Sequence, residues 1–385
     1  MAVGFSISNV SKQGKKTLSI LTSYIPQILS KQGSSCQAEV YVSIRGNTLF
    51  HDNGRYLFVL LKTLASSFSK VAINRLSLTD YYRMGTYGRK IFSISNLVVD
   101  NSLPAERKDR LLIYDRSAPD LSGWRSRIRI ETDISLAQPD DVPWVLMPYC
   151  MHPNVYTLFE RAEIQALRCS ARTLRLFFTG SVRPSLYSGR GFWQTAGFDL
   201  MSRVQIIDTI KANLGDAIAQ IDTQEDLDPL LSADAPNKIV LGDSQQIYVQ
   251  PRNWLPLLSR CNFFICPPGI DMPLCHNAIE AMAVGTIPLL NYPHWFSPGL
   301  EDLHTCISYR TESELIEKVG LICSMPVAQI AEMRENVIHY YETHLAFDGF
   351  YQRLNSTNHP QQTLFLNTGD RNILERITPT SVIWG

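Results

Sequence analysis

The sequence has no long apolar run and no excess of one charge, two features that assign many proteins to a class directly. No stretch approaches the ~18–20 uninterrupted apolar residues of a spanning helix, so we expect no such helix. The opening MAVGFSISNVSKQGKK has its lysines after a mild apolar patch and no small-residue cleavage site, unlike a signal peptide. Lys plus Arg number 36 and Asp plus Glu number 36, and a formally neutral chain argues against a general nucleic-acid binder.

Cysteine pairs and low-complexity segments are also missing. The 8 cysteines are scattered with no C-x-x-C pair, which is typical of reduced, mostly buried thiols in a reducing compartment. Gly and Pro, 21 of each, form neither a linker nor a repeat. We therefore expect a soluble cytoplasmic protein, in which any membrane association is peripheral.

What the chain does contain is enough apolar sequence for two domains. The apolar fraction is 45%, and 385 residues exceed what one core usually holds. Strand-like runs alternate with segments of helical spacing, which indicates βα units, mainly parallel sheets and an α/β fold of two Rossmann-like domains. The expected strands are Ala38–Ile44, Ser69–Asn74, Lys90–Val99, Leu111–Tyr114, Arg127–Glu131, Pro143–Tyr149, Leu174–Phe178, Lys238–Leu241, Cys261–Cys266, Thr286–Leu290 and Thr305–Tyr309. The expected helices are Thr17–Ser30, Gly54–Phe68, Tyr156–Ser170, Leu200–Leu214, Pro251–Arg260, Met272–Val284, Thr311–Ile322 and Val327–Leu345.

The alternation restarts after a connecting helix at Tyr156–Ser170, which indicates a domain boundary there. We expect an N-terminal Rossmann-like domain over residues 1–165 and a C-terminal one over 170–345. A tail over 346–385 is expected to pack back on the first domain. Tyr81–Arg89 is predicted to be a loop.

The most informative segment is Cys261–Tyr292. Its apolar strand runs into Pro267-Pro268-Gly269, which indicates a tight turn before a helix. Asp271 is a candidate N-cap, and Pro273 suits the first turn of that helix. Gly285 stands where the C-terminal cap of the helix is expected.

The predicted turn lies at the carboxyl end of a parallel strand, where α/β sheets bind ligands. Unpaired backbone N–H groups at the helix start, about residues 272–275, would form a site for a diphosphate. His276 and Glu280 are four residues apart and share one helix face. Glu280 stands among small and apolar residues, where an unpaired buried carboxylate is costly. Two interpretations stay open: Glu280 is a solvated helix residue, or it binds ribose hydroxyls.

Several strings carry a resemblance to a known family. IEAMAVGTIPLL, at Ile279–Leu290, resembles the Glu-Ala…Gly-x-x-Pro element in the nucleotide-sugar-binding domain of GT-B glycosyltransferases. PPGIDMPLCHNAIEA is most similar to the exostosin-like branch of that family. LRLFFTGSVRPSLYSGR resembles the first strand and loop of the same domain, and MRENVIHYYETHL its closing helix. The resemblance covers about residues 173–345. His276 stands where many relatives have arginine, and Met272 replaces the first glutamate of many retaining enzymes.

The resemblance implies roles for particular residues. The C-terminal domain would bind the nucleotide sugar and the N-terminal domain the acceptor. Glu280 would bind the donor ribose, and Tyr248 or Pro251 would line the base pocket. The residues implied for the diphosphate are Gly269, Asp271, His276, Asn277 and Arg183, with Arg190 as a weaker choice. The catalytic base would come from the N-terminal half, with Asp115 and His152 as the preferred candidates and His51-Asp52 as the third.

The expected function is therefore transfer of a sugar from a nucleotide-diphosphate donor to a glycan, lipid-linked or other hydroxyl acceptor. We expect inverting chemistry without a metal or other cofactor, because cationic side chains and helix ends would replace the metal. Cys261, Cys266, Cys275 and His276 have no common zinc spacing. The alternatives are a non-catalytic nucleotide-binding or assembly protein with a GT-B shell, and a two-domain epimerase.

Overall fold

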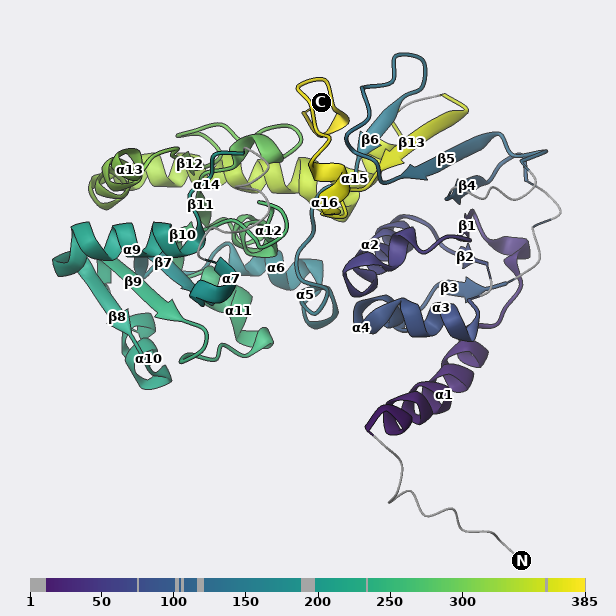
Figure 1. Ribbon diagram of the computed structural model, residues 1–385, viewed down its shortest axis with the longest axis horizontal. Coiled ribbons are helices and arrows are strands. Elements are labelled where there is room, and N and C mark those ends of the chain that lie inside the picture. Colours follow the sequence, from purple (N-terminus) through teal and green to yellow (C-terminus); the bar gives the residue numbers. More distant parts are fainter. Residues whose placement is uncertain are drawn as a thin grey trace, which may run out of the picture. The chain divides into compact units, whose positions relative to one another are not determined.

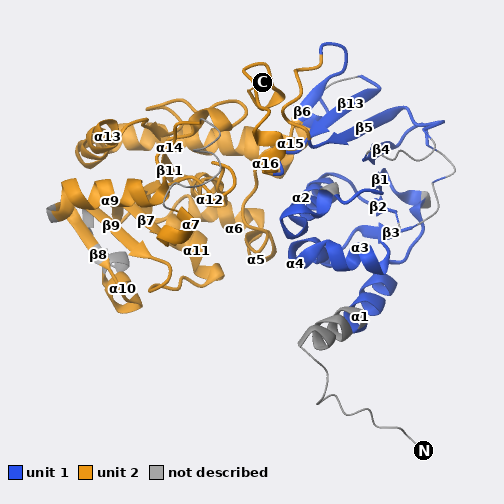
Figure 2. Ribbon diagram, viewed as in Figure 1, with its two compact units in different colours: residues 1–132, 140–145, 354–368 blue, residues 133–139, 146–353, 369–385 orange. Residues whose placement is uncertain are grey.

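A computed structural model of the protein describes residues 12–74, 76–100, 104, 107–115, 121–187, 198–232, 235–356 and 359–384 (Figure 1). The chain forms two compact units, coloured separately in Figure 2. Unit 1 comprises residues 1–132, 140–145 and 354–368, and unit 2 comprises 133–139, 146–353 and 369–385. Each unit contains a sheet with parallel strand pairs, so the expected α/β fold of two Rossmann-like units is confirmed.

Unit 1 is built on a seven-stranded sheet with the order β3-β2-β1-β4-β5-β13-β6. β1 pairs in parallel with both β2 and β4, so the chain first extends the sheet on one side of β1 and then on the other. The strands are β1 (Val40–Ser43), β2 (Val71–Ile73), β3 (Leu97–Val99), β4 (Leu111–Tyr114), β5 (Ser126–Glu131), β6 (Trp144–Leu146) and β13 (Gln361–Phe365).

The helices of unit 1 differ from expectation at two places. The predicted strand Lys90–Val99 is wrong over its first half, which forms the 3-10 helix η4 (Arg89–Ser93). Strand β2 has only three residues, so it pairs with only three residues of the neighbouring segment, Leu97–Val99, which form β3. The predicted loop Tyr81–Arg89 is largely helical. The helical elements of this unit are α1 (Lys12–Lys31), η2 (Ser35–Gln37), η3 (Thr48–Phe50), α2 (His51–Ser67), α3 (Leu78–Arg83), α4 (Gly85–Gly88) and η4.

Unit 2 contains a six-stranded parallel sheet with the order β12-β11-β10-β7-β9-β8. β7 (Leu174–Gly180) and β10 (Cys261–Ile265) are neighbours at its centre, and their residues are almost entirely buried. The remaining strands are β8 (Ile218–Ile221), β9 (Ala235–Asp243), β11 (Ile287–Leu290) and β12 (Ile307–Ser308).

Helices cover both faces of this second sheet, as Figure 1 shows. α9 (Arg203–Leu214) packs with α13 (Glu312–Ser324), and α11 (Pro251–Leu258) packs with α12 (His276–Ala283). The predicted helix Tyr156–Ser170 is interrupted and forms two helices, the short α5 (Val155–Leu158) and α6 (Arg161–Leu167). Glu160 is the N-cap of α6. The other helical elements are α7 (Pro184–Tyr187), η5 (Gly215–Ala217), α10 (Gln224–Ser232), η6 (Pro293–Trp295), α14 (Val327–Tyr340), η7 (Tyr341–Leu345), α15 (Phe347–Leu354), α16 (Arg371–Leu374) and η8 (Val382–Trp384). Among the residues described, no helix has both the length and the apolar character needed to cross a bilayer.

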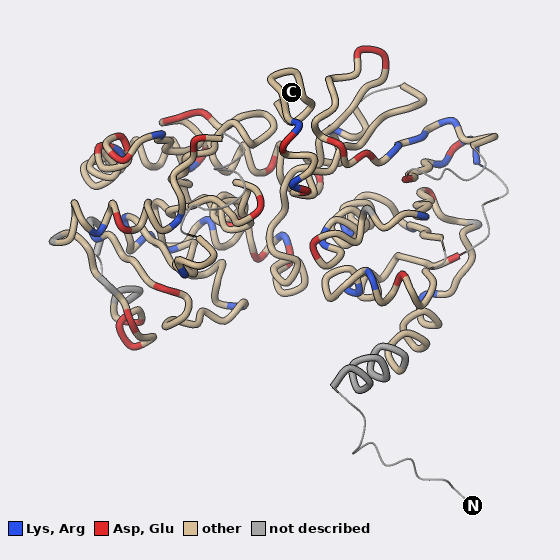
Figure 3. Tube along the Cα trace, viewed as in Figure 1, with Lys and Arg blue, Asp and Glu red and all other residues tan. Residues whose placement is uncertain are grey.

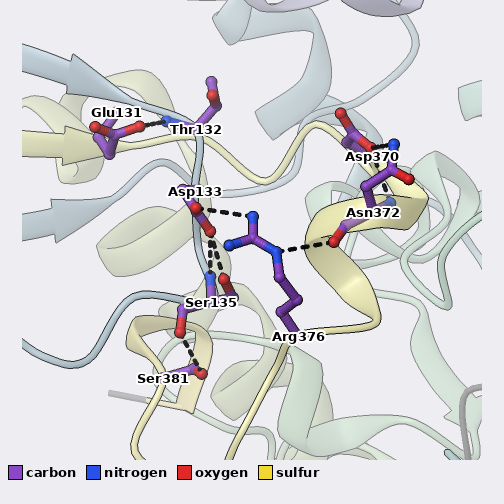
Figure 4. Close-up of polar contacts among 8 residues, drawn as sticks. All are labelled: Glu131, Thr132, Asp133, Ser135, Asp370, Asn372, Arg376 and Ser381. Atoms are coloured by element: carbon purple, nitrogen blue, oxygen red, sulfur yellow. Dashed lines mark hydrogen bonds and ion pairs between the residues drawn. The ribbon is translucent and has the colours of Figure 1, made fainter.

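The C-terminal tail is divided between the units. β13 joins the sheet of unit 1 beside β5, whereas residues 369–384 belong to unit 2. There the Arg376 guanidinium donates to Asp133 Oδ2 at 2.9 Å and to the Asn372 carbonyl at 3.0 Å (Figure 4). Ser381 Oγ donates to the Ser135 carbonyl at 2.9 Å. The chain also changes units at residues 145–146, earlier than the expected boundary between 165 and 170.

Candidate functional site

The carboxyl edge of the unit 2 sheet contains its topological switch point. From β7 the chain builds β8 and β9 on one side, then crosses to build β10, β11 and β12 on the other. Because all these strands are parallel, the loops after β7 and β10 leave the sheet at the same edge, next to each other. Open α/β sheets bind ligands at this position. The candidate site is therefore formed by the Gly180–Tyr187 loop and the Cys266–Cys275 loop.

The loop after β10 ends later than the sequence predicted. The Gly269 N–H donates to the Pro273 carbonyl at 3.1 Å, which closes a turn over residues expected to be helical. A Cβ on Gly269 would lie 2.6 Å from the Met272 carbonyl oxygen, so this turn requires glycine. Helix α12 begins at His276 with Cys275 as its N-cap, so the predicted start near Met272 is wrong. The amides available to an anion are therefore those at the start of α12, not those of residues 272–275.

Asp271 does not cap this helix, contrary to the sequence prediction. Its Oδ1 instead pairs with Arg371, 2.5 Å from Nη2 and 3.1 Å from Nε, and both side chains are 57% exposed. The C-terminal cap is confirmed: Gly285 has φ +74°, its N–H donates to Met282, and Thr286 N–H donates to Ala281. These two bonds form a Schellman motif.

Glu280 is buried, with 1% of its surface exposed. Its Oε1 accepts the backbone N–H of His152 at 2.8 Å, and its Oε2 accepts the indole N–H of Trp254 at 2.6 Å. The interpretation of Glu280 as a solvated helix residue is therefore wrong. The carboxylate joins α12 to α11 and to the turn before α5, which explains how a charged group is accommodated in an apolar helix.

The two histidines singled out from the sequence lie next to each other in unit 2. The rings of His152 and His276 are 5.4 Å apart with an interplanar angle of 65°, and both residues are half-buried. His152 was assigned to the N-terminal half, but it belongs to the unit that contains the candidate donor residues. Its Nδ1 accepts the Asn154 N–H at 3.2 Å, so the neutral ring carries its proton on Nε2. In that state His152 donates at Nε2, which suits an anion better than it suits a base.

Arg203 is a buried cation that the sequence analysis missed. It is 6% exposed at the first position of α9, whose N-terminus is capped by Ser202 and Gln205. The guanidinium lies 4.0 Å above the Tyr187 ring, and donates to the carbonyls of Ser181 at 3.2 Å and Pro268 at 3.4 Å.

Arg203 therefore bridges the loops after β7 and β10 at the switch point. No acidic side chain of the described residues forms an ion pair with it, and its buried Nε has no hydrogen-bond partner among them. An uncompensated buried guanidinium is costly, and an anion between the two loops would stabilise it. The sequence carries no signal for this role, because Arg203 is the first residue of an amphipathic helix.

The other expected donor residues are more exposed or lie outside the site. Arg183 is exposed, and Tyr248 is 72% exposed after β9. Asn277 is half-buried as the second residue of α12, and Pro251 is the first residue of α11. Arg190 lies outside the described residues. Burial raises the pKa values of Cys266 and Tyr292 at this edge well above their ordinary range, so both groups stay protonated.

In unit 1, Asp115 follows β4 at the corresponding switch point between β1 and β4. It is 1% exposed, and its Oδ2 accepts the backbone N–H groups of Arg45 at 2.9 Å and Gly46 at 2.5 Å. The carboxylate thus ties the end of β4 to the turn after β1. In the third candidate pair, Asp52 forms an ion pair with Arg55 at 2.6 Å.

No three His, Cys, Asp or Glu side chains among the described residues group in a way that could hold a metal ion. Cys261, Cys266 and Cys275 are buried free thiols.

No protein-family model matches the chain, and no curated protein matches it significantly in sequence. Among solved structures it is similar to Anabaena HepE in complex with UDP, at 11% identity over 83% of this chain and 98% of that chain, with a TM-score of 0.41. The Thermobaculum terrenum O-GlcNAc transferase is similar at 11% identity over 96% of this chain and 75% of that chain, with a TM-score of 0.35. AviGT4, a glycosyltransferase involved in avilamycin A biosynthesis, is similar at 12% identity over 82% and 98%, with a TM-score of 0.34. At such identities and TM-scores, neither a family nor an activity follows for this chain.

Proposed function

We propose that the chain is a GT-B glycosyltransferase whose unit 2 binds the diphosphate of a nucleotide-sugar donor at the carboxyl edge of its sheet. The observation that carries this proposal is the buried Arg203, which lies at the switch point and, among the described residues, contacts two carbonyls and the Tyr187 ring but no acidic side chain. A diphosphate oxygen would give this guanidinium the charge-assisted bonds that it lacks. The resemblance of Ile279–Leu290 to the GT-B element supports a sugar nucleotide as the source of that diphosphate.

The start of α12 would supply the second group of diphosphate contacts. This helix has eight residues and no side-chain cap, so its first amides and its dipole suit an anion. His276 is its first residue, and the His152 ring lies beside it. We propose that both imidazoles donate to diphosphate oxygens, in place of the arginine of many exostosin-like relatives.

Glu280 keeps its proposed contact with the donor ribose, but it has a structural role as well. The donor ribose would contact this carboxylate beside the His152 and Trp254 N–H groups that it accepts.

The reaction proposed is a single displacement at the anomeric carbon. An acceptor hydroxyl oxygen forms the new bond, the bond to the donor phosphate oxygen breaks, and the electron pair leaves with the diphosphate. The acceptor proton passes to a base, and the configuration inverts. We propose that Arg203, the imidazoles and the start of α12 stabilise the leaving diphosphate without a metal. The acceptor would be a glycan or lipid-linked hydroxyl.

The test compares two arginines in a binding titration with the nucleoside diphosphates UDP and GDP. Arg203→Gln should weaken binding of the preferred nucleoside diphosphate by about tenfold or more, because a charge-assisted bond contributes roughly 1.5–3 kcal/mol. Arg183→Gln is the matched control, because Arg183 is exposed on the loop after β7 that Arg203 contacts. The nucleotide affinity of this variant should stay within about twofold of the wild-type affinity. Arg203→Lys, which keeps the charge, should lie between the two. If Arg203→Gln binds as the wild type does, the proposal loses its basis.

A non-catalytic nucleotide-binding protein is the second candidate function. It is favoured by Asp115 and Glu280, because both carboxylates already accept two protein N–H groups. Incubation with a panel of nucleotide sugars and hydroxyl acceptors in EDTA separates the two. Release of nucleoside diphosphate with a glycosylated product supports the transferase, whereas binding without turnover supports the alternative.

A further inference from the structure

The Tyr187 ring covers one face of the Arg203 guanidinium. The guanidinium carbon lies 4.0 Å from the centroid of the ring. A cation over an aromatic ring is attracted by the electron density of the ring face, and the attraction is strongest where water is excluded. Arg203 is 6% exposed, so water is largely excluded here. Tyr187 therefore offsets part of the cost of burying this cation.

The edge of the same guanidinium is only partly used. Its Nη1 donates to the Ser181 carbonyl at 3.2 Å, and its Nη2 donates to the Pro268 carbonyl at 3.4 Å. Its buried Nε has no hydrogen-bond partner among the described residues. A guanidinium has five N–H donors in one plane, so two bonds to neutral carbonyls leave donors for an anion. An aromatic ring and an anion can thus contact one guanidinium together, the ring over its face and the anion in its plane.

The segments that contact Arg203 supply no carboxylate to it. The loop Gly180–Tyr187 contains no aspartate or glutamate, and neither does the first turn of α9. Figure 3, in which acidic residues are red, shows α7 without one. Asp271, in the loop after β10, pairs with Arg371 instead. A carboxylate would occupy the N–H groups that a diphosphate needs, whereas a neutral ring leaves them available.

Local structure holds Tyr187 in this place. It is the last residue of α7, and its N–H donates to the Arg183 carbonyl at 3.0 Å. α7 packs with α9, the helix that begins with Arg203. Tyr187 is half-buried, whereas the other residues of α7 are exposed. It is therefore the least exposed residue of α7, as expected of a side chain that packs on Arg203.

We propose that Tyr187 is a positioning residue for diphosphate binding, which holds the Arg203 guanidinium in the orientation that presents its unused N–H groups to the anion. This inference rests on the function proposed above. Arg203 would contact the diphosphate, and Tyr187 would act through Arg203. Because the ring acts through its face, phenylalanine should replace tyrosine here, and an aliphatic residue should not.

The test titrates the full chain with UDP, GDP and inorganic pyrophosphate, which carries the anion without a nucleoside. Tyr187→Phe should bind within about twofold of the wild type, because the aromatic face is kept. Tyr187→Leu should weaken binding about fivefold or more, because Arg203 loses the contact that fixes its orientation. Tyr82→Leu is the matched control, because Tyr82 is 52% exposed in unit 1, and this variant should keep the wild-type affinity. Thermal unfolding of each variant shows that the titrated protein is folded.

A double-mutant cycle on affinity separates positioning from a merely structural role. In the Arg203→Gln background, Tyr187→Leu should cause no further loss, because no guanidinium remains to be oriented. Equal losses in Tyr187→Phe and Tyr187→Leu, or additive effects in the cycle, would overturn the proposal. If Arg203→Gln lowers the affinity and Tyr187→Leu does not, this inference alone is wrong. If Arg203→Gln binds as the wild type does, the proposed function is wrong as well.

Discussion

The indole N–H of Trp254 donates to Oε2 of Glu280 at 2.6 Å, which links helix α11 to a carboxylate inside α12. The other oxygen, Oε1, accepts the His152 N–H at 2.8 Å. Glu280 thus connects three segments around the candidate donor site. Substitutions of Glu280 will therefore affect stability as well as ligand binding.

Trp254→Phe should destabilise unit 2 by about 1–3 kcal/mol, because it leaves one oxygen of a buried carboxylate without its donor. Urea unfolding of the full chain measures this change. Glu280→Gln combined with Trp254→Phe should cost less than the sum of the two single changes, because the substituted groups interact directly. Additive effects in this double-mutant cycle would show that the bond contributes no coupling.

Gly269→Ala should destabilise the loop after β10 and weaken diphosphate binding, because the new Cβ would lie 2.6 Å from the Met272 carbonyl oxygen. Gly320→Ala is the matched control, since its Cβ would meet nothing within 4 Å in the middle of α13. That control should gain roughly 0.5–1 kcal/mol from helix propensity. Thermal unfolding and nucleotide titration measure both variants, and equal behaviour of the two would contradict the assigned turn.

Asp115→Asn should separate a positioning role from a catalytic one. Asparagine keeps one carbonyl oxygen for the Arg45 and Gly46 amides, so we expect nearly unchanged stability and less than about tenfold loss of transfer rate. A general base replaced by an amide would instead lower the rate by ~10²-fold or more. Transfer rates of wild type and Asp115→Asn at saturating donor distinguish the two roles, and unfolding measured on the same samples shows whether stability has changed.

The Asp133–Arg376 pair predicts a pH-dependent contribution to the stability of unit 2. Burial alone would raise the pKa of Asp133, but hydrogen bonds from Ser135 and Arg376 and the charge of Arg376 hold it below its ordinary value. A lowered folded pKa contributes stability above about pH 4, which is lost as the pH falls through the folded value. The difference in unfolding free energy between wild type and Asp133→Asn should be largest near pH 7 and shrink towards pH 3. A difference that is constant over that range contradicts the assigned pair.

The local features of the segment Cys261–Tyr292 were predictable because they depend on neighbouring residues. The apolar strand β10, the turn at Pro267–Gly269 and the cap at Gly285 all follow from intrinsic backbone preferences. The start of α12 was misplaced because the Gly269–Pro273 bond closes the turn over residues whose pattern is also compatible with helix. Asp271 looked like a cap, but it pairs with Arg371, a residue far along the chain.

The sequence by itself determined that this chain forms α/β units, because periods of two and 3.6 residues are local properties of strands and helices. It also pointed to Glu280, since a carboxylate in an apolar run requires partners. Only the tertiary structure decided what those partners are: His152 lies 128 positions away, and it meets Glu280 because both belong to unit 2. The buried position of Arg203 was decided in the same way, because β7 and β10 become neighbours only when the sheet assembles around its switch point.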